Sequence, residues 1–323
     1  MILSQYTFAI KHMTPRNAPA ALRSSIGCPL CQAEGRASAY LEYGQYQWQR
    51  CSNCAFGFQV PYVAEHLRTN AGNDISDTYS AFSEESLPPS VTDEKCQWVL
   101  SSCTAQRALL IEIGPGRGQL LDAVRRARNE WVVFAVEPYQ KFVSILQARG
   151  IRVVPSVRAL GTNSDIQLAA QGCTQLVVVA DNVLEHLEHP VEVLRELRML
   201  AASLNLPLVV LIEVPNERAL SWRHGLQDLL RGFKKAPTFP GHINLFEKAT
   251  LVRAAYAAGF GGISVKGHAI RTTAQLEYLL RDQVRSKLAI AAVFVLSLMP
   301  LDSWLGLAYW LRGELRSAPH SAT

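Results

Sequence analysis

Apolar and polar stretches alternate along the middle of the chain. Five short apolar runs have the length of β-strands, and they cover residues 109–113, 131–136, 151–154, 175–180 and 207–214. Before and between them, apolar positions at helical spacing predict helices near residues 91–103, 119–128, 138–149 and 189–203. Strands that alternate with helices in this way predict an α/β protein with a parallel sheet and helices on both faces.

Distinctive residues close four of these apolar runs. Gly114 follows the first run, Glu137 the second, Asp181 the fourth, and Pro215 ends the last. In open α/β sheets, ligands bind at the carboxyl ends of the strands, where the strand order reverses. The sequence therefore predicts a ligand site along this edge of the sheet.

The loop after the first run is rich in glycine. Gly114, Gly116 and Gly118 let the backbone turn sharply and approach a ligand without interference from Cβ atoms. The free N–H groups of the following helix point into the same gap, which favours a nucleotide-like ligand. A dinucleotide fingerprint requires glycine at its sixth position, where this chain has Gln119.

Two acidic residues accompany the glycine loop. Glu112 lies two residues before it, and a carboxylate there suits a cationic ligand better than a pyrophosphate. Glu137 closes the second run, where its two oxygens can accept hydrogen bonds from both hydroxyls of a ribose. The loop and these two acids together favour a nucleoside with a positive charge.

This arrangement resembles the class I S-adenosylmethionine-dependent methyltransferases. Three further blocks follow in the order and spacing of that family: Asp-Asn-Val-Leu-Glu-His at 181–186, Leu-Ile-Glu-Val-Pro-Asn at 211–216, and His-Ile-Asn-Leu-Phe at 242–246. The set is similar to the subgroup that acts on sugars, glycans and other small metabolites. The resemblance covers residues 28–270 and implies a Rossmann-like methyltransferase sheet.

The resemblance also implies roles for individual residues. Glu112 would position the methionyl ammonium of S-adenosylmethionine, directly or through water. Asp181 and Asn182 would line the methionine end of the cofactor. His242 is the candidate general base, because the pKa of histidine lies near neutrality. His186 is a second catalytic candidate that could orient the substrate.

Alternatives remain for both histidines. His242 could be a residue at the N-terminus of a helix without a catalytic role, and His186 a surface histidine. Sugar C-methyltransferases have Tyr and Glu before this histidine, where this chain has Phe239 and Gly241. A single histidine base fits O-methylation better than C-methylation.

Four cysteines near the N-terminus form two CxxC pairs. Cys28 and Cys31 are separated by 19 residues from Cys51 and Cys54, and the stretch between the pairs is strand-like. Two such turns can close a tetrahedral zinc site without an open position, which predicts a structural zinc ribbon. Disulfides and buried free thiols are the alternatives. The other three cysteines, which lack this spacing, are expected in the core: Cys96, Cys103 and Cys173.

The pattern divides the chain into successive regions. Residues 1–25 are expected to be loose, residues 26–62 to form the zinc ribbon, and residues 63–104 to form a connector and a covering helix. Residues 105–283 would form the cofactor-binding methyltransferase domain, and residues 284–315 an apolar helical tail.

Residues 217–240 interrupt the methyltransferase domain with an excess of basic residues. They are interpreted as either a solvated surface segment or a lid over the active site. The second interpretation favours an anionic substrate, held by cations such as Lys234 and Lys235.

The apolar tail contains residues 288–299, a run without charge that is too short to span a bilayer. Three interpretations stay open for the tail: a packed helical pair, a peripheral membrane contact through residues 284–311, and a span. The family sheet normally ends with an antiparallel strand. Residues 316–323 are not strand-like, so that strand is expected near residues 274–280, or as short or absent.

Composition narrows the expected partners and compartment. The net charge of +5 is mild. Between Cys28 and Val60, two arginines are balanced by two glutamates, so no nucleic-acid partner is expected. Seven cysteines without an evident export signal favour the cytoplasm, with membrane contact at its inner face if the tail provides one. The alternatives to a methyltransferase of a small or lipid-linked metabolite are an RNA methyltransferase and a non-catalytic cofactor-binding module.

Overall fold

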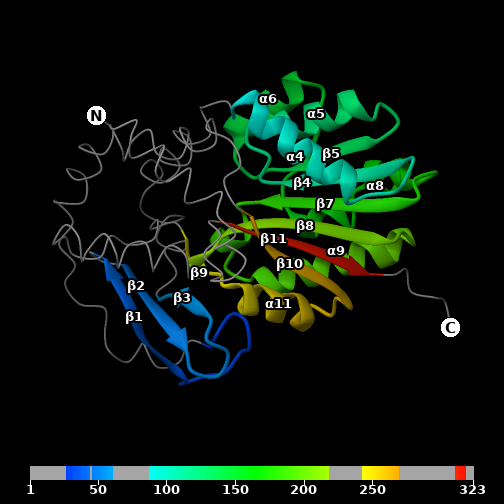
Figure 1. Cartoon of the computed structure of the whole chain (residues 1–323). Helices are drawn as coiled ribbons and strands as arrows, with labels where there is room; N and C mark the ends of the chain where they lie inside the picture. Colours follow the sequence, from blue (N-terminus) through cyan, green and yellow to red (C-terminus); the bar gives the residue numbers. More distant parts are fainter. Residues whose placement is uncertain (1–26, 44–45, 61–86, 218–241, 269–309, 318–323) are drawn as a thin grey trace, which may run out of the picture.

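The computed structural model describes residues 27–43, 46–60, 87–217, 242–268 and 310–317. Figure 1 shows a large layered body with a smaller sheet beside it. The body is an α/β fold of the Rossmann-like type, with a mixed central sheet of seven strands.

The central sheet has the strand order β10-β11-β8-β7-β4-β5-β6. The five parallel strands are β4 (Ala108–Ile113), β5 (Val132–Val136), β6 (Arg152–Val154), β7 (Gln175–Asp181) and β8 (Leu208–Pro215). They match the five apolar runs, so this part of the sequence prediction is confirmed. Since both faces are covered, β4 and the first six residues of β7 are buried without interruption.

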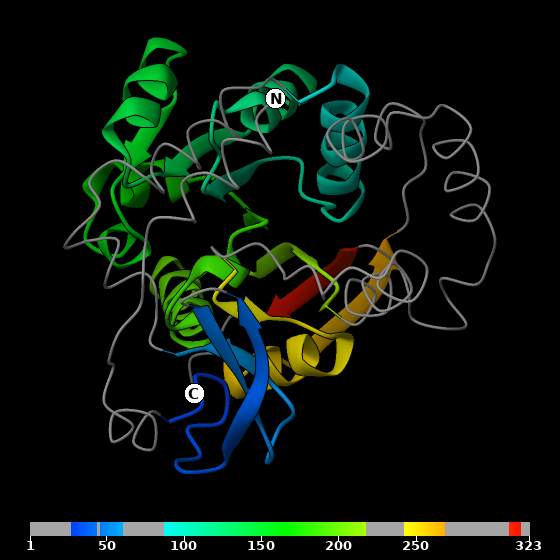
Figure 2. The same ribbon diagram turned by 90° about the vertical axis from the view of Figure 1, so that its left-hand side faces the viewer.

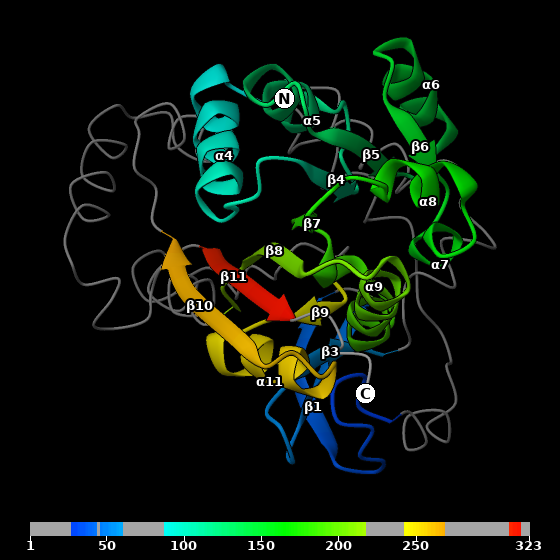
Figure 3. The ribbon, with the colours of Figure 1, turned by 90° about the vertical axis from the view of Figure 1, so that its right-hand side faces the viewer.

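Helices cover the two faces of this sheet, as Figure 3 shows. One face carries α4 (Pro89–Ser101), α5 (Gln119–Ala127) and α6 (Gln140–Ala148). The other carries α7 (Val157–Leu160), α8 (Ser164–Ala170), α9 (Pro190–Leu204) and α11 (Lys248–Ala257). Each set packs its apolar stripe onto the sheet, which makes two cores. Cys96, Cys103 and Cys173 are buried in them, as predicted.

The last strand corrects the sequence prediction. β11 (Trp310–Ser317) lies between β8 and β10 (Gly262–His268) and is antiparallel to both. The predicted helical tail is therefore wrong over residues 310–315, and the alternative that the last antiparallel strand is absent is wrong as well. Alternate positions Leu311, Gly313 and Leu315 are buried, and the charged residues between them, which disguised the strand, form ion pairs. Residues 274–280 and 284–309 lie outside the described residues.

A second sheet forms at the edge of the body (Figure 2). Its order is β1-β2-β3-β9, with β1 (Ala37–Tyr43), β2 (Tyr46–Cys51) and β3 (Gly57–Gln59) from the N-terminal ribbon. Its fourth strand, β9 (Asn244–Leu245), comes from the 242–246 block, which the sequence placed at the start of a helix. The helix α11 (Lys248–Ala257) begins only at Lys248, and its N-terminus is closed by a capping box between Glu247 and Thr250. The ribbon is thus joined to the segment that carries His242.

Candidate functional site

The glycine loop has the left-handed backbone that the sequence suggested. Gly114, Gly116 and Gly118 have φ of 64°, 53° and 76°. A Cβ at Gly118 would lie 2.6 Å from Leu146 and 2.9 Å from Ile151, so α5 can approach β6 and α6 only with glycine at its N-cap. The loop therefore brings the N-terminus of α5 to the carboxyl end of β4.

Glu112 lies near the end of β4 and is 5% exposed. Its Oε2 atom has no hydrogen-bond partner among the residues that the structure describes. Burial, followed by the negative charge of Asp181, raises the pKa of Glu112 to about 8. A buried carboxyl with an unsatisfied oxygen is suited to receive a cationic ligand.

Glu137 follows β5 directly and is 4% exposed. Its Oε1 atom accepts a hydrogen bond of 3.0 Å from the backbone N–H of Tyr139. Burial raises the pKa of Glu137 to about 7. Glu112 and Glu137 lie at the ends of neighbouring parallel strands, on the two sides of the glycine loop.

Asp181 belongs to a buried ion network that the sequence analysis missed. The Lys95 ammonium on α4 contacts the Asp181 carboxylate and lies 3.2 Å from Glu213 Oε1. Arg312 on β11 contacts Glu213 Oε2 at 2.5 Å and Glu94 Oε1 at 2.6 Å. Although burial alone would raise it, these cations lower the pKa of Glu213 to about 2. No sequence signal connects residues so far apart, because only the sheet order brings β7, β8 and β11 together.

Asn182 is held in the left-handed region with a φ of 53°. Its Nδ2 donates a hydrogen bond of 2.9 Å to Asp181 Oδ1, and its backbone N–H donates to Glu213 O at 2.8 Å. The side chains of Asp181 and Asn182 are therefore bound to the protein itself. This pair forms a preorganised turn at the end of β7, next to the glycine loop.

Two predicted catalytic residues, His186 and His242, lie together. Their ring centroids are 5.0 Å apart with an interplanar angle of 60°. Burial, followed by the nearby charge of His186, lowers the pKa of His242 well below its usual value. His242 is thus neutral at physiological pH, which leaves a nitrogen lone pair to accept a proton or bind a ligand.

Glu185 completes this group and was missed as a site residue in the sequence. It is 1% exposed, and neither carboxylate oxygen has a hydrogen-bond partner in the described part of the chain. Its Oε1 lies 3.8 Å from His186 Nε2. Burial raises the pKa of Glu185 well above its usual value. A glutamate beside a histidine at the end of a strand was the available signal.

The segment with His242 is held from two sides. Trp48 Nε1 donates a hydrogen bond of 2.8 Å to His242 O, and Gln59 N donates to Ile243 O at 2.8 Å. Asn244 Nδ2 donates to the backbone oxygen of Leu184 at 3.1 Å. The ribbon therefore sets the position of His242 relative to Glu185 and His186.

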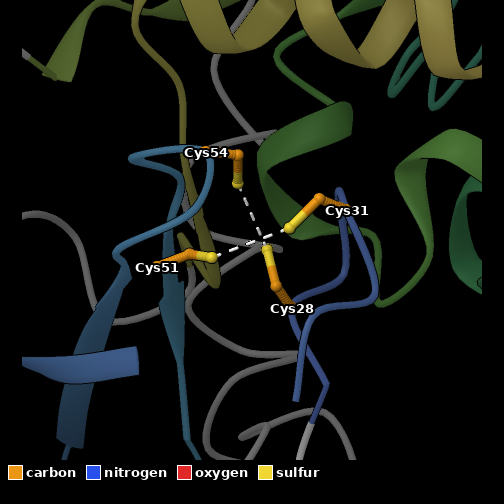
Figure 4. Close-up of side chains that lie close together, drawn as sticks. All are labelled: Cys28, Cys31, Cys51 and Cys54. Carbon is orange, nitrogen blue, oxygen red and sulfur yellow. Dashed lines mark hydrogen bonds between the residues drawn. The ribbon is translucent and has the colours of Figure 1, made fainter. Parts of the chain in front are cut away.

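The four predicted metal cysteines converge, as Figure 4 shows. The Sγ atoms of Cys28 and Cys54 are 3.5 Å apart, those of Cys31 and Cys51 are 3.6 Å apart, and all four lie within 4.8 Å of one another. These separations are too long for disulfides. They are close to the spacing of about 3.8 Å that sulfurs have around a tetrahedral zinc ion. The four cysteines thus fit a zinc ion.

The comparisons place the chain in a family. A family model described as a methyltransferase domain matches residues 91–265, which is more than half of the 323 residues. The chain belongs to this family. It is a class I S-adenosylmethionine-dependent methyltransferase. No curated protein matches the sequence.

Solved structures with a similar fold include two methyltransferases and a cyclopropane synthase. A methyltransferase from Archaeoglobus fulgidus is 16% identical, with 76% of this chain and 100% of that chain covered and a TM-score of 0.46. The plantazolicin methyltransferase BamL, solved with S-adenosylhomocysteine and a triazolic desmethylPZN analog, is 11% identical, with 78% of this chain and 92% of that chain covered and a TM-score of 0.45. The mycolic acid cyclopropane synthase CmaA1 is 15% identical, with 69% and 82% covered and a TM-score of 0.41.

Two predicted regions fall largely outside the described residues. Of the lid-like segment 217–240, only Glu217 is described, and it is buried with its N–H bonded to Phe246 O at 2.9 Å. Of the tail 284–315, only residues 310–315 are described. None of the described helices has the length and apolar character needed to cross a membrane.

Proposed function

We propose that this methyltransferase transfers the methyl group of S-adenosylmethionine to a hydroxyl oxygen of a small or lipid-linked metabolite, with a sugar or glycan as the first candidate. One observation carries the proposal. The half-buried imidazole of His242 lies against His186 and close to Glu185, both of which follow β7, the strand next to the glycine loop. A cofactor half and an acceptor half of a site thus share one edge of the sheet.

The cofactor half consists of residues at the ends of β4, β5 and β7. Glu112 would receive the methionyl ammonium, because it offers a buried carboxylate oxygen that has no partner among the described residues. Glu137 would accept both ribose hydroxyls. The glycine loop and the backbone of Asp181 and Asn182 would surround the methionine portion.

In the acceptor half, His242 would take the proton of the acceptor hydroxyl while its oxygen attacks the sulfonium methyl. The S–CH3 bond breaks, its electron pair stays on sulfur, and S-adenosylhomocysteine leaves. His186 would orient the acceptor. Neutral histidine suits this step because a base must be unprotonated at the working pH.

The N-terminal part, residues 26–62, is proposed to be a zinc ribbon with Cys28, Cys31, Cys51 and Cys54 as ligands. Four thiolate ligands leave no open position on zinc, so the ion would be structural. We also propose the other domain boundaries that the sequence predicts and a cytoplasmic location. The proposed substrate is anionic and is covered by the basic lid, and residues 284–311 are proposed to contact a membrane.

The test compares metabolites and glycans from cells with and without the gene by mass spectrometry. We expect a species in wild-type cells that is heavier by one CH2 group and disappears without the gene. A plasmid encoding His242→Ala should fail to restore it, although that protein still binds S-adenosylhomocysteine. His189→Ala, an exposed histidine nearby, is the matched control and should restore it. Restoration by His242→Ala would refute the base.

A further inference from the structure

Glu185 presents a problem of charge. Both of its carboxylate oxygens are buried and lack a hydrogen bond within the described residues. Burying a carboxylate in this way is costly unless a cation or a proton neutralises it. Lys95, the buried cation of the neighbouring network, already bridges Asp181 and Glu213. The side chains that do adjoin Glu185 are two imidazoles, which are metal ligands in their neutral form.

We propose that Glu185, His186 and His242 form a binding site for a divalent first-row transition metal ion that coordinates the acceptor oxygen. The inference rests on the proposed methyl transfer to a hydroxyl oxygen and revises one role in it, since His242 acts as a metal ligand instead of as the base. Two imidazoles and one carboxylate are a common donor set for such ions, and they leave coordination positions open for a substrate oxygen. This site is separate from the cysteine site, which has no open position.

The geometry suits this donor set. The ligand atoms of the three residues lie within 4.8 Å of one another, and Glu185 Oε1 is 3.8 Å from His186 Nε2. Two donors bound about 2.1 Å from the same ion lie about 3.0–4.2 Å apart. Small side-chain rotations therefore bring all three onto one ion.

The surroundings hold two of the ligands in place. Trp48 fixes the backbone of His242 from the ribbon side, and Asn244 ties the strand of His242 to the turn of Glu185 by hydrogen bonds to Leu184 O and Leu187 O. Supporting contacts of this kind orient the ligands of metal sites and tune their affinity.

A bound cation changes how the acceptor is activated. Coordination lowers the pKa of the acceptor hydroxyl, and its proton leaves to solvent water. The oxygen then forms the O–CH3 bond as the S–CH3 bond breaks, with the electron pair retained on sulfur. His242 is in that case a metal ligand, and the cation replaces it as the means of activating the hydroxyl.

The experiment uses the full chain, loaded with zinc and then dialysed against a weak chelator until one zinc per chain remains. Mn²⁺ binding is measured by electron paramagnetic resonance, and the zinc bound at equilibrium with excess Zn²⁺ is counted by elemental analysis. In the wild type we expect the Mn²⁺ titration to show one site, and the zinc count to rise from one to two ions per chain. Glu185→Gln and His186→Ala should each weaken the new site at least about tenfold. His189→Ala should bind like the wild type.

Binding of S-adenosylhomocysteine, measured on every variant, shows that each is folded. The proposal is overturned if the wild type binds no Mn²⁺ and no zinc beyond the one ion at the cysteines. It is also overturned if Glu185→Gln and His186→Ala bind the additional ion with the affinity of the wild type. Once the methylated metabolite is known, equal turnover with and without the second ion overturns the role of the cation in activation. Failure of the proposed function is a separate result, because it is the absence of a methylated species in cells.

Discussion

The cofactor half of the proposed site predicts a steep pH dependence of cofactor binding. S-adenosylhomocysteine carries the same ammonium and ribose as the cofactor, so it should require ionised Glu112 and Glu137. In the free protein their pKa values are about 8 and about 7. At pH 6, ionising Glu112 therefore costs about 3 kcal/mol and ionising Glu137 about 1 kcal/mol, since each pKa unit corresponds to about 1.4 kcal/mol.

These costs disappear as the pH rises above both pKa values. Affinity for S-adenosylhomocysteine should therefore increase about 1000-fold between pH 6 and pH 8.5 in the wild type. Glu112→Gln removes the larger contribution, so its affinity should increase only about tenfold over the same range, and Glu137→Gln about 100-fold. The expected loss on substituting Glu112 is greatest at high pH, where its carboxylate is charged in the wild type.

Isothermal titration calorimetry from pH 6 to pH 8.5, repeated in two buffers of different ionisation enthalpy, gives the affinity and the protons released. Close to two protons should leave per ligand at pH 6 in the wild type and close to one in Glu112→Gln. A wild-type affinity that does not change with pH, or an equal pH dependence in Glu112→Gln, would refute the assignment of Glu112 to the ammonium.

The same group makes the ligand-free protein less stable at high pH. Its pKa is raised on folding, so between its ordinary value of 4.5 and about 8 the folded state binds more protons than the unfolded state. The free energy of unfolding should fall across that window, with a contribution of up to about 5 kcal/mol from Glu112. Denaturation of Glu112→Gln should show a correspondingly flatter pH profile, and parallel profiles would contradict the raised pKa.

Three further predictions test the framework of the site. Gly118→Ala should lower the free energy of unfolding, measured by urea titration, by about 1–3 kcal/mol, because its φ is positive and a Cβ there would clash. Gly161→Ala is the control and should leave the free energy of unfolding unchanged, because Gly161 has a negative φ and room for a Cβ. Lys95→Met leaves Asp181 without its cation and Glu213 with Arg312 alone, and should lower the free energy of unfolding by about 3–5 kcal/mol. Adding Asp181→Asn should recover part of this loss, and full additivity of the two substitutions would argue against the network. Cys51→Ser, which breaks the cysteine cluster, should increase amide hydrogen exchange in β9, and unchanged protection there would separate the ribbon from the His242 segment.

Several elements could be predicted because their signals are local. The five parallel strands, the glycine loop and the CxxC pairs each depend on residues adjacent in sequence, whose burial period or backbone requirement is visible in the chain itself. β11 was mispredicted because one of its charged residues, Arg312, is compensated by Glu94 and Glu213, which lie far away in the sequence. In β11 only every second residue is buried, and the residues between them are charged or polar. The strand therefore lacks the continuous apolar run of the parallel strands.

The sequence by itself determined the α/β class, the turn of the glycine loop and the clustering of the four cysteines, since each needs only short-range geometry. Only the tertiary structure decided that Glu185, His186 and His242 form one group, and that the N-terminal ribbon pairs with β9 beside them. The physical reason is that contacts between distant segments depend on sheet order and on the turns that join the strands. Burial then decides what Glu185 needs, because a carboxyl removed from water requires a proton or a cation that an exposed carboxyl would not.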